Sequence, residues 1–498
     1  MIIPIIDKLR YSVPIQFSLL IGPTTLATDV QGHGIIPPMQ PAETTPVLAK
    51  NIRYAYLLIA VAVVTAFQIA RQTAYNVHPD EFVHVDAFCY FENHWWPPEL
   101  NSDELAYSPY GWSRVYDGEI VYLIYGRLGR LIQSILPAGS STASCQARAP
   151  QIVWIYRSLN VFLYLITLWI LFRTGRKHPW SLLIGLLLLV VPQVTYVYAY
   201  ANSDAWGLSM GIFLFVFVLA RHEKLLHSWP DVIGLAGLTG LVLLSKETDW
   251  LSLPFSYLLV GWFLFNELKD RRPFPVHRTA GSLALLLAVT FVVIMPSTIV
   301  YPLTQGDYEA RAEQMREARA VPALKPSHPT NPGYRLAERG FSFLRVLADR
   351  RWIKLSLQSL YGRFGYMSIK PPVRLYNLAL ALFLSLAFLT YGFAIYRWRQ
   401  ISTTDRMMLL IAPLGVISVV LTSMYHSWIF DFQPQGRYLF SALIPLAMIF
   451  GGTAASEPRW LQGLRLFIWA LLLFLGLYIL WVVLLGDPQL VFSSRTYG

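Results

Sequence analysis

Eleven apolar segments, separated by polar loops, constrain this chain more than any other feature of its sequence. A helix rises 1.5 Å per residue, so about 20 apolar residues cross the roughly 30 Å hydrocarbon core of a bilayer. Only 14% of the 498 residues are charged, whereas soluble domains carry about 25%. The sequence therefore predicts an all-α integral membrane protein with about 11 transmembrane helices, at residues 54–70, 152–172, 181–199, 206–220, 231–245, 251–265, 279–301, 374–395, 407–424, 435–452 and 463–484.

The basic residues indicate how these helices are oriented. The net charge is +11, but Lys and Arg lie mostly in alternate short loops, which is typical of membrane orientation and does not favour nucleic-acid binding. Arg173, Arg176 and Lys177 follow the second segment, and Arg397 and Arg399 follow the eighth. The pattern predicts a multi-pass protein of the inner (cytoplasmic) membrane, with its N-terminus inside and its C-terminus outside.

The chain divides into a cytoplasmic N-terminal tail (1–53), a membrane domain (54–484) and a C-terminal tail outside (485–498). Two long outside segments, 71–151 and 301–373, interrupt the membrane domain. Residues 307–320 predict a solvated charged helix. Residues 341–361 predict a basic amphipathic helix that either lies on the membrane surface or packs on the first outside segment. A third amphipathic pattern, 120–136, favours a surface helix because it contains Arg127 and Arg130.

The first outside segment holds the only two cysteines, Cys89 and Cys145. The outer side of a bacterial membrane permits disulfides, so the two residues form either a disulfide or a pair of free thiols.

Ionisable residues cluster just beyond the first apolar segment, at His78, Asp80, Glu81 and His84. Such groups at the rim of a membrane domain are costly to place there, and paired carboxylates suit proton abstraction or cation binding. Pro79 favours a helix beginning at this point, so an acidic helix cap is the alternative.

Three more polar loops follow the third, fifth and ninth apolar segments, and the predicted topology places them on the same side. They contain Asp204, Lys246 with Glu247, and Arg437 with Tyr438. Each also has a structural interpretation: Asp204 as a helix cap, Lys246 and Glu247 as an interfacial pair, and Arg437 as a donor to loop carbonyls. Their joint occurrence nevertheless predicts one site, built from four loops.

A metal is a second interpretation of the acidic cluster. Glu81 and His84 have the Glu-x-x-His spacing of carboxylate metal sites, while the zinc pattern His-Glu-x-x-His is absent. A divalent cation, Mg²⁺ or Mn²⁺ bound to a phosphate, fits these ligands better than zinc. Use of a metal stays open at this point.

The ordered motifs resemble those of GT-C glycosyltransferases, and more specifically a bacterial branch formerly listed as a domain of unknown function. The resemblance covers about residues 54–450, and Ser441 departs from the proline expected at its position. The motifs that carry it are His78-Pro79-Asp80-Glu81, Asn202-Ser203-Asp204, Lys246-Glu247-Thr248, Gly362-Arg363-Phe364-Gly365-Tyr366-Met367 and Gln435-Gly436-Arg437-Tyr438-Leu439-Phe440.

The resemblance implies an inverting glycosyltransferase that moves a sugar from a polyprenyl-phosphate donor to a lipid or cell-envelope glycan acceptor, at an active site facing outside, towards the periplasm. Asp80 would be the general base, and Lys246 and Arg437 would hold the donor phosphate. The expected catalytic residues are Asp80 and Glu81, and the expected substrate-binding residues are His78, His84, Asp204, Lys246, Glu247, Arg437 and Tyr438.

The rival class is a transporter or flippase of a lipid-linked sugar, which requires polar groups near the bilayer midplane. Arg157 and Asn160, early in the second apolar segment, are the main candidates for such groups. A polysaccharide polymerase or ligase differs from the transferase chiefly in its acceptor, and a metallopeptidase lacks a complete ligand set.

Overall fold

The structure is a computed structural model that describes residues 52–135, 144–222, 225, 228–269, 276–348, 350–453 and 457–491. The predicted N-terminal tail thus lies almost wholly outside the described residues, and so do residues 492–498 of the predicted C-terminal tail.

The described residues form helices, turns and loops, and contain no β-strand; two isolated bridges pair Tyr334 with Asp431 and Phe364 with Ile369. The long helices are α2 (Ile52–Gln72), α5 (Ala149–Thr174), α8 (Asp204–Arg221), α9 (Trp229–Leu243), α10 (Ser252–Lys269), α11 (Val276–Met295), α16 (Val373–Tyr396), α17 (Thr403–Ile429) and α19 (Arg459–Tyr478). The shorter ones are α3 (Glu81–Phe91), α4 (Ile120–Ile135), α6 (Pro179–Val190), α7 (Pro192–Val197), α12 (Tyr301–Thr304), α13 (Tyr308–Arg319), α14 (Phe343–Ala348), α15 (Trp352–Gly362) and α18 (Leu443–Gly451).

Seven helical stretches of the described chain are long and apolar enough to cross a membrane: Tyr54–Gln72, Gln146–Thr174, Asp204–Arg221, Gly281–Thr304, Val373–Tyr396, Thr403–Ile429 and Arg459–Leu484. The other four predicted segments are helical too. Segment 181–199 forms α6 and α7, 231–245 forms α9, 251–265 forms α10, and 435–452 forms a 3₁₀ turn followed by α18. An all-α membrane protein is therefore confirmed. The number of eleven spans and their orientation remain predictions.

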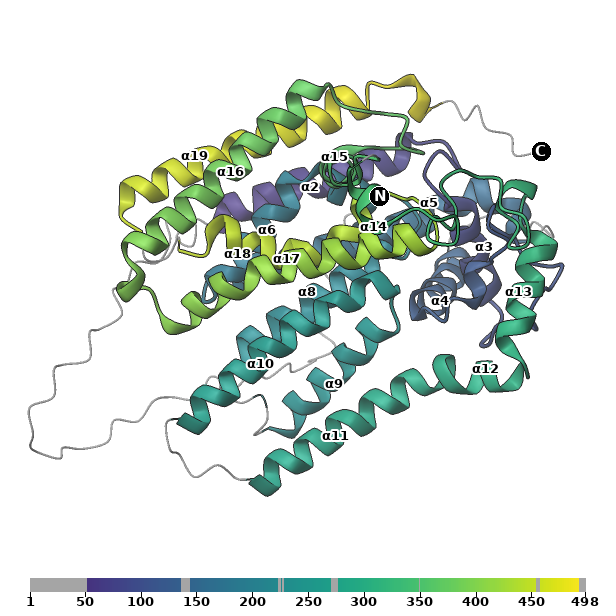
Figure 1. Ribbon diagram of the computed structural model, residues 1–498, viewed down its shortest axis with the longest axis horizontal. Coiled ribbons are helices and arrows are strands. Elements are labelled where there is room, and N and C mark those ends of the chain that lie inside the picture. Colours follow the sequence, from purple (N-terminus) through teal and green to yellow (C-terminus); the bar gives the residue numbers. More distant parts are fainter. Residues whose placement is uncertain are drawn as a thin grey trace, which may run out of the picture. The chain divides into compact units, whose positions relative to one another are not determined.

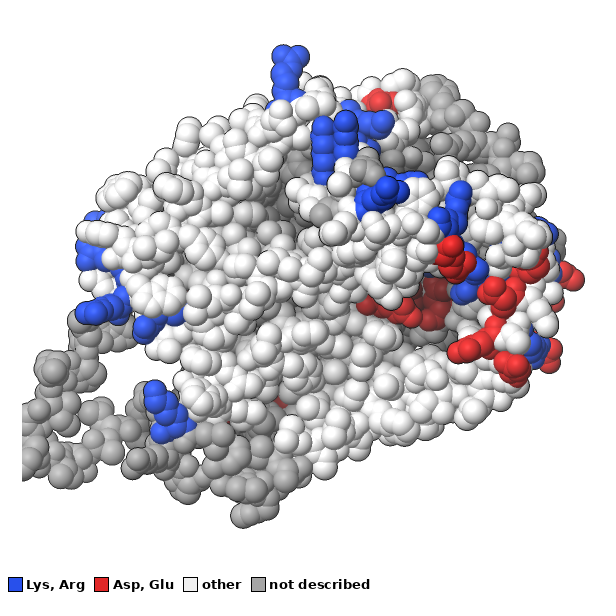
Figure 2. All heavy atoms as spheres, viewed as in Figure 1, with Lys and Arg blue, Asp and Glu red and all other residues white. Residues whose placement is uncertain are grey.

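The distribution of charge fits a membrane protein. On the face shown in Figure 2, Lys, Arg, Asp and Glu gather towards the ends of the helices and leave a broad uncharged surface between them. Large apolar side chains are exposed along the long helices, for example Phe291, Phe388 and Phe474. Such a surface is stable against lipid and unfavourable in water.

Neighbouring helices pack in pairs: α11 lies against α9, α2 against α5, α17 against α18, and α16 against α19 (Figure 1). The predicted segment 181–199 is not one helix, because Val191 is extended and Pro192 begins α7. A proline lacks the N–H that would continue the ladder, and it disfavours a helical conformation of the preceding residue.

The predicted helix 341–361 is also interrupted. It forms α14 and α15, and Arg351 between them has a positive φ of 53° that a helix cannot contain. The charged helix predicted at 307–320 is confirmed as α13, which begins where the Asp307 side chain accepts a hydrogen bond from the Ala310 N–H.

The two cysteines, 56 positions apart in the sequence, form a disulfide that joins α3 to the turn before α5. Near the other end of the chain, the carbonyl of Leu490 accepts a hydrogen bond from the N–H of Ala74, and the Leu490 side chain is buried. Both contacts fix the segment between α2 and α5 in which the acidic cluster lies.

Candidate active site at the ends of the helices

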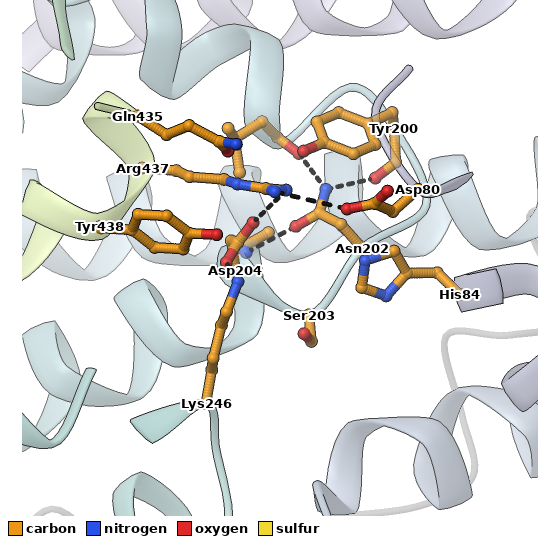
Figure 3. Close-up of polar contacts among 12 residues, drawn as sticks. Asp80, His84, Tyr200, Asn202, Ser203, Asp204, Lys246, Gln435, Arg437 and Tyr438 are labelled. Atoms are coloured by element: carbon orange, nitrogen blue, oxygen red, sulfur yellow. Dashed lines mark hydrogen bonds and ion pairs between the residues drawn. The ribbon is translucent and has the colours of Figure 1, made fainter. Parts of the chain in front are cut away.

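Four loops distant in the sequence bring charged side chains together at one end of the helices (Figure 3). The Arg437 guanidinium lies between two carboxylates, with Nη1 3.4 Å from Asp204 Oδ2 and Nη2 3.5 Å from Asp80 Oδ2. Lys246 Nζ donates to the other oxygen of Asp204 at 2.7 Å. The structure thus places Asp80, Asp204, Lys246 and Arg437 in one cluster.

Asp80 is the most open carboxylate of this cluster. Its side chain is 26% exposed, against 4% for Asp204, and its two ion pairs are long, 3.5 Å to Arg437 and 4.0 Å to Arg114. Helix α3 begins at the next residue, but the Asp80 side chain makes no capping hydrogen bond. The acidic-cap alternative therefore does not describe this residue.

The backbone of Asp80 is in the left-handed region, with φ 58° and ψ 13°. Among residues other than glycine, Asp and Asn adopt this region most readily. The Asp80 N–H donates to the hydroxyl of Tyr366, which comes from the loop between α15 and α16. The loop conformation thus fixes where the carboxylate points.

Glu81, the adjacent residue, has a different environment. Its side chain is fully buried, and its two oxygens accept hydrogen bonds from Arg157 at 2.8 and 2.7 Å. They also accept from the N–H groups of Asn76 and Ala201. Arg157 in addition donates to three carbonyls at the end of α2 and in the loop after it. The pair therefore ties α5 to the loop that carries Asp80.

Asp204 begins α8 but does not cap it. The capping oxygen belongs to Asn202, which accepts from the Ala205 N–H at 3.0 Å, so the Asp204 carboxylate is available to the two cations. Lys246 Nζ also lies 5.0 Å from the centre of the Tyr438 ring. Cations favour the face of an aromatic ring, so Tyr438 helps to hold Lys246 towards Asp204.

The two histidines are buried and each bonds a tyrosine. His78 Nδ1 lies 2.8 Å from the Tyr196 hydroxyl, and His84 Nδ1 lies 2.8 Å from the Tyr122 hydroxyl. Burial, and secondly the nearby cation Arg157, lowers the pKa of His78 well below its usual range. Burial likewise lowers the pKa of His84. Both rings are neutral at pH 7, and neither Nε2 has a hydrogen-bond partner.

Within the described residues, the acidic cluster does not assemble as a set of metal ligands. Glu81 is paired with Arg157, and the Nδ1 atoms of both histidines face tyrosines. Among the described residues, the His, Cys and acidic side chains that lie close enough together to share a metal ion are Cys89, Glu92 and Cys145. The sulfurs of Cys89 and Cys145 are joined in the disulfide.

Glu247 lies apart from the cluster. It is exposed at the start of the 3₁₀ turn Glu247–Leu251, while Lys246 before it points inward. Tyr438 donates to Gln433 at 2.5 Å. Ser441, the departure from the family pattern, donates to the Thr248 carbonyl at 2.9 Å and so links these two loops.

A cavity of about 240 Å³ opens beside the cluster. Asp80 and Arg437 line it together with Arg363, Tyr366 and Gln435. The backbone is crowded here, since a Cβ at Gly436 would lie 1.9 Å from the backbone nitrogen of Leu360. Only glycine allows the Arg437 turn to approach α15 this closely.

Four residues of the site were not among those expected from the sequence. Arg114 lies 4.0 Å from Asp80, Tyr366 bonds its backbone, Tyr200 lines the cavity, and Arg157 holds Glu81. Arg157 carried a signal, because an arginine inside an apolar segment requires a buried partner. Tyr366 lies in one of the family motifs.

The apolar helices and the polar cluster at one of their ends define a polytopic membrane protein with a candidate ligand site. The chain belongs to the family of predicted membrane proteins designated DUF2142, whose family model matches residues 142–450.

Two solved structures show a weaker likeness, both of ArnT from Cupriavidus metallidurans. The structure bound to undecaprenyl phosphate is 15% identical, with a TM-score of 0.44, over 86% of this chain and 64% of that one. The apo structure is 14% identical, with a TM-score of 0.41, over 84% and 62%. This chain thus spans less than two thirds of the length of ArnT. No curated protein matches the sequence.

Proposed function

We propose that this protein is an inverting GT-C-type glycosyltransferase that moves a sugar from a polyprenyl-phosphate donor to a hydroxyl of a lipid or glycan acceptor. The observation that carries the proposal is the state of Asp80, a carboxylate held open at a cavity while its neighbours Glu81 and Asp204 are enclosed by cations. A general base needs such access to the proton that it removes.

In the proposed step, Asp80 accepts the proton of the acceptor hydroxyl as its oxygen attacks the anomeric carbon. The new C–O bond forms while the bond from that carbon to the phosphate oxygen breaks, and the electron pair leaves on the lipid phosphate. A single displacement inverts the anomeric configuration. Arg437 and Arg363, which line the same cavity, would stabilise the charge that develops on the phosphate.

The other cluster residues receive supporting roles. Asp204 holds both Arg437 and Lys246 in place, and Glu81 with Arg157 positions the loop of Asp80. His78 and His84, neutral and bonded to tyrosines, fill the space behind that loop. A divalent cation, Mg²⁺ or Mn²⁺, at the donor phosphate stays a prediction, and the proposed step uses residues of the chain alone.

An apolar groove of about 600 Å³ lies between α15, α16 and α18. We propose that it holds the lipid chain of the donor. Leu357, Phe383 and Leu446 line it, and Arg351 and Lys354 stand among its lining residues. Gln358, also in the groove, accepts a hydrogen bond from Arg363 at 2.6 Å. A prenyl chain in this groove would therefore lead its phosphate towards the cations of the cavity.

The transporter alternative is less well supported. The two polar groups that it would need near the midplane already have partners within the protein. Arg157 pairs with Glu81, and Asn160 donates to the carbonyls of Tyr200 and Asn202. We place the cavity on the outer face, because Arg397, Arg399 and other cations occupy short loops expected inside.

The test is sugar transfer by the purified protein in liposomes, with a panel of polyprenyl-phosphate sugars as donors and total envelope lipids and glycans as acceptors. Asp80→Asn keeps the left-handed backbone and the size of the side chain but removes the base. We expect a loss of at least about a hundredfold in rate. Asp103→Asn, on the exposed surface of the same segment, is the control and retains the wild-type rate.

Consumption of one donor by wild type and not by Asp80→Asn supports the proposal. If neither protein consumes a donor while labelled lipid crosses the bilayer with both, the flippase interpretation replaces it.

A further inference from the structure

A second groove, of about 410 Å³, shares no lining residue with the cavity at Asp80. Its walls include Trp95 and Trp96 from the loop after α3, Leu123 of α4, Val293 near the end of α11, and Ser297 in the π-helical turn that continues α11. Because Val293 and Ser297 belong to a helix apolar enough to span the membrane, the groove lies at the end of that span.

One carboxyl group lies among these apolar walls. Glu119 lines the groove, its side chain is buried, and its Oε2 has no hydrogen-bond partner. Leaving a buried polar atom unpaired costs about 1–3 kcal/mol, so a ligand that bonds this oxygen would recover that energy. Burial, with a further contribution from Asp117, raises the pKa of Glu119 to about 8. At pH 7 the carboxyl is therefore mostly protonated and can both donate and accept.

Two aromatic side chains at the same groove are largely exposed. Trp95 is 66% exposed and Trp96 is 52% exposed, and the Arg127 guanidinium lies 4.0 Å from the centre of the Trp95 ring. Flat aromatic faces pack well against the C–H faces of sugar rings, and indole suits a place between lipid and water. The apolar end of α11 suits an alkyl chain.

We propose that this groove binds the acceptor, an amphiphile whose alkyl chain lies along the end of α11 and whose hydroxylated head group bonds Glu119. That this amphiphile is the acceptor rests on the proposed function. That it binds in the groove is independent of the proposed function. The groove adjoins the charged cluster, because Ser203 interacts with Glu119 and lies 3.4 Å from the Tyr122 hydroxyl that bonds His84.

The test uses thiol protection in phosphatidylcholine nanodiscs. The two native cysteines form the disulfide, so Ser297→Cys supplies a single reactive thiol in the groove. The probe is octyl β-glucoside below its micellar concentration, and octanol is the matched amphiphile without a sugar. Thr298→Cys, exposed on the neighbouring position, is the control thiol at the same depth.

We expect octyl glucoside, and not octanol, to slow maleimide labelling of the Ser297→Cys thiol while the Thr298→Cys thiol reacts at an unchanged rate. Adding Glu119→Leu should weaken this protection about tenfold, and Glu119→Gln, which keeps a hydrogen-bonding group, should change it less than about threefold. Circular dichroism checks that each variant is folded.

Equal protection by octanol, equal slowing at both thiols, or no effect of Glu119→Leu in folded protein overturns the proposal. Protection is measured without turnover, so it distinguishes the two proposals. Protection without sugar transfer retains the groove and rejects the transferase, and transfer without protection does the reverse.

Discussion

Glu81→Gln tests whether the glutamate beside Asp80 acts in catalysis or in positioning. The Glu81 and Arg157 side chains are 0% and 3% exposed, and two hydrogen bonds of 2.8 and 2.7 Å join them. Gln supplies one oxygen in place of two, and it leaves the buried guanidinium without a counter-charge. Removing one member of a buried ion pair costs about 3–5 kcal/mol. We expect a loss of that size in the free energy of unfolding.

The assay is unfolding by SDS in mixed micelles, followed by circular dichroism and tryptophan fluorescence, alongside the rate of sugar transfer per folded protein. Glu104→Gln, on an exposed loop of the same segment, should change the unfolding free energy by less than about 0.5 kcal/mol. Positioning predicts that Glu81→Gln loses stability and retains more transfer than Asp80→Asn. Stability within about 1 kcal/mol of wild type together with a transfer rate as low as that of Asp80→Asn would refute the argument.

Three further predictions concern stability, measured by the same unfolding assay. Gly207→Ala should destabilise the protein by about 1–3 kcal/mol, because its Cβ would lie 1.8 Å from the buried carboxylate oxygen of Asp249. Gly261→Ala, whose Cβ would have nothing within 4 Å, is the control and should stabilise the protein by up to about 1 kcal/mol. Equal effects of the two substitutions would contradict this packing. Replacing Cys89 and Cys145 by Ser, which opens a loop of 56 residues, should cost about 4 kcal/mol, and a cost below about 1 kcal/mol would show that the disulfide contributes little to stability. Burial raises the pKa of Asp86 to about 6, so the stability that its protonated form contributes is present below about pH 4 and is lost as the pH rises through 6. Asp86→Asn should therefore remove about 2 kcal/mol of the stability change between pH 4 and 7, and pH profiles identical to wild type would refute that shift.

The local pattern of the chain predicted much of the fold. Each of the eleven apolar segments forms helix over most of its length, and Pro79 precedes a helix that begins at Glu81. Two predicted helices are interrupted, at Val191 and near Arg351. At Val191 the following proline was a visible signal. The positive φ of Arg351 had no such signal, because arginine has no particular preference for the left-handed region.

For the site, the sequence predicted which residues lie close together better than it predicted the role of each residue. Four polar loops on one predicted side indicated a shared site, and the structure brings Asp80, Asp204, Lys246 and Arg437 together. The sequence could not distinguish Asp80 from Glu81, since adjacent carboxylates have the same intrinsic chemistry. Helix α3 begins between them, so one side chain faces the cavity and the other faces Arg157.

The sequence by itself determined that this protein is an all-α membrane protein, because apolar length acts segment by segment. It also predicts on which side the polar loops lie, from the placement of Lys and Arg. Tertiary structure alone decided the environment of each ionisable group. Arg157 is 76 residues from Glu81 in the chain, and Arg437 is 357 residues from Asp80. Whether a carboxylate is enclosed by a cation or open to a cavity depends on such distant partners, and it is this difference that makes Asp80 the candidate base.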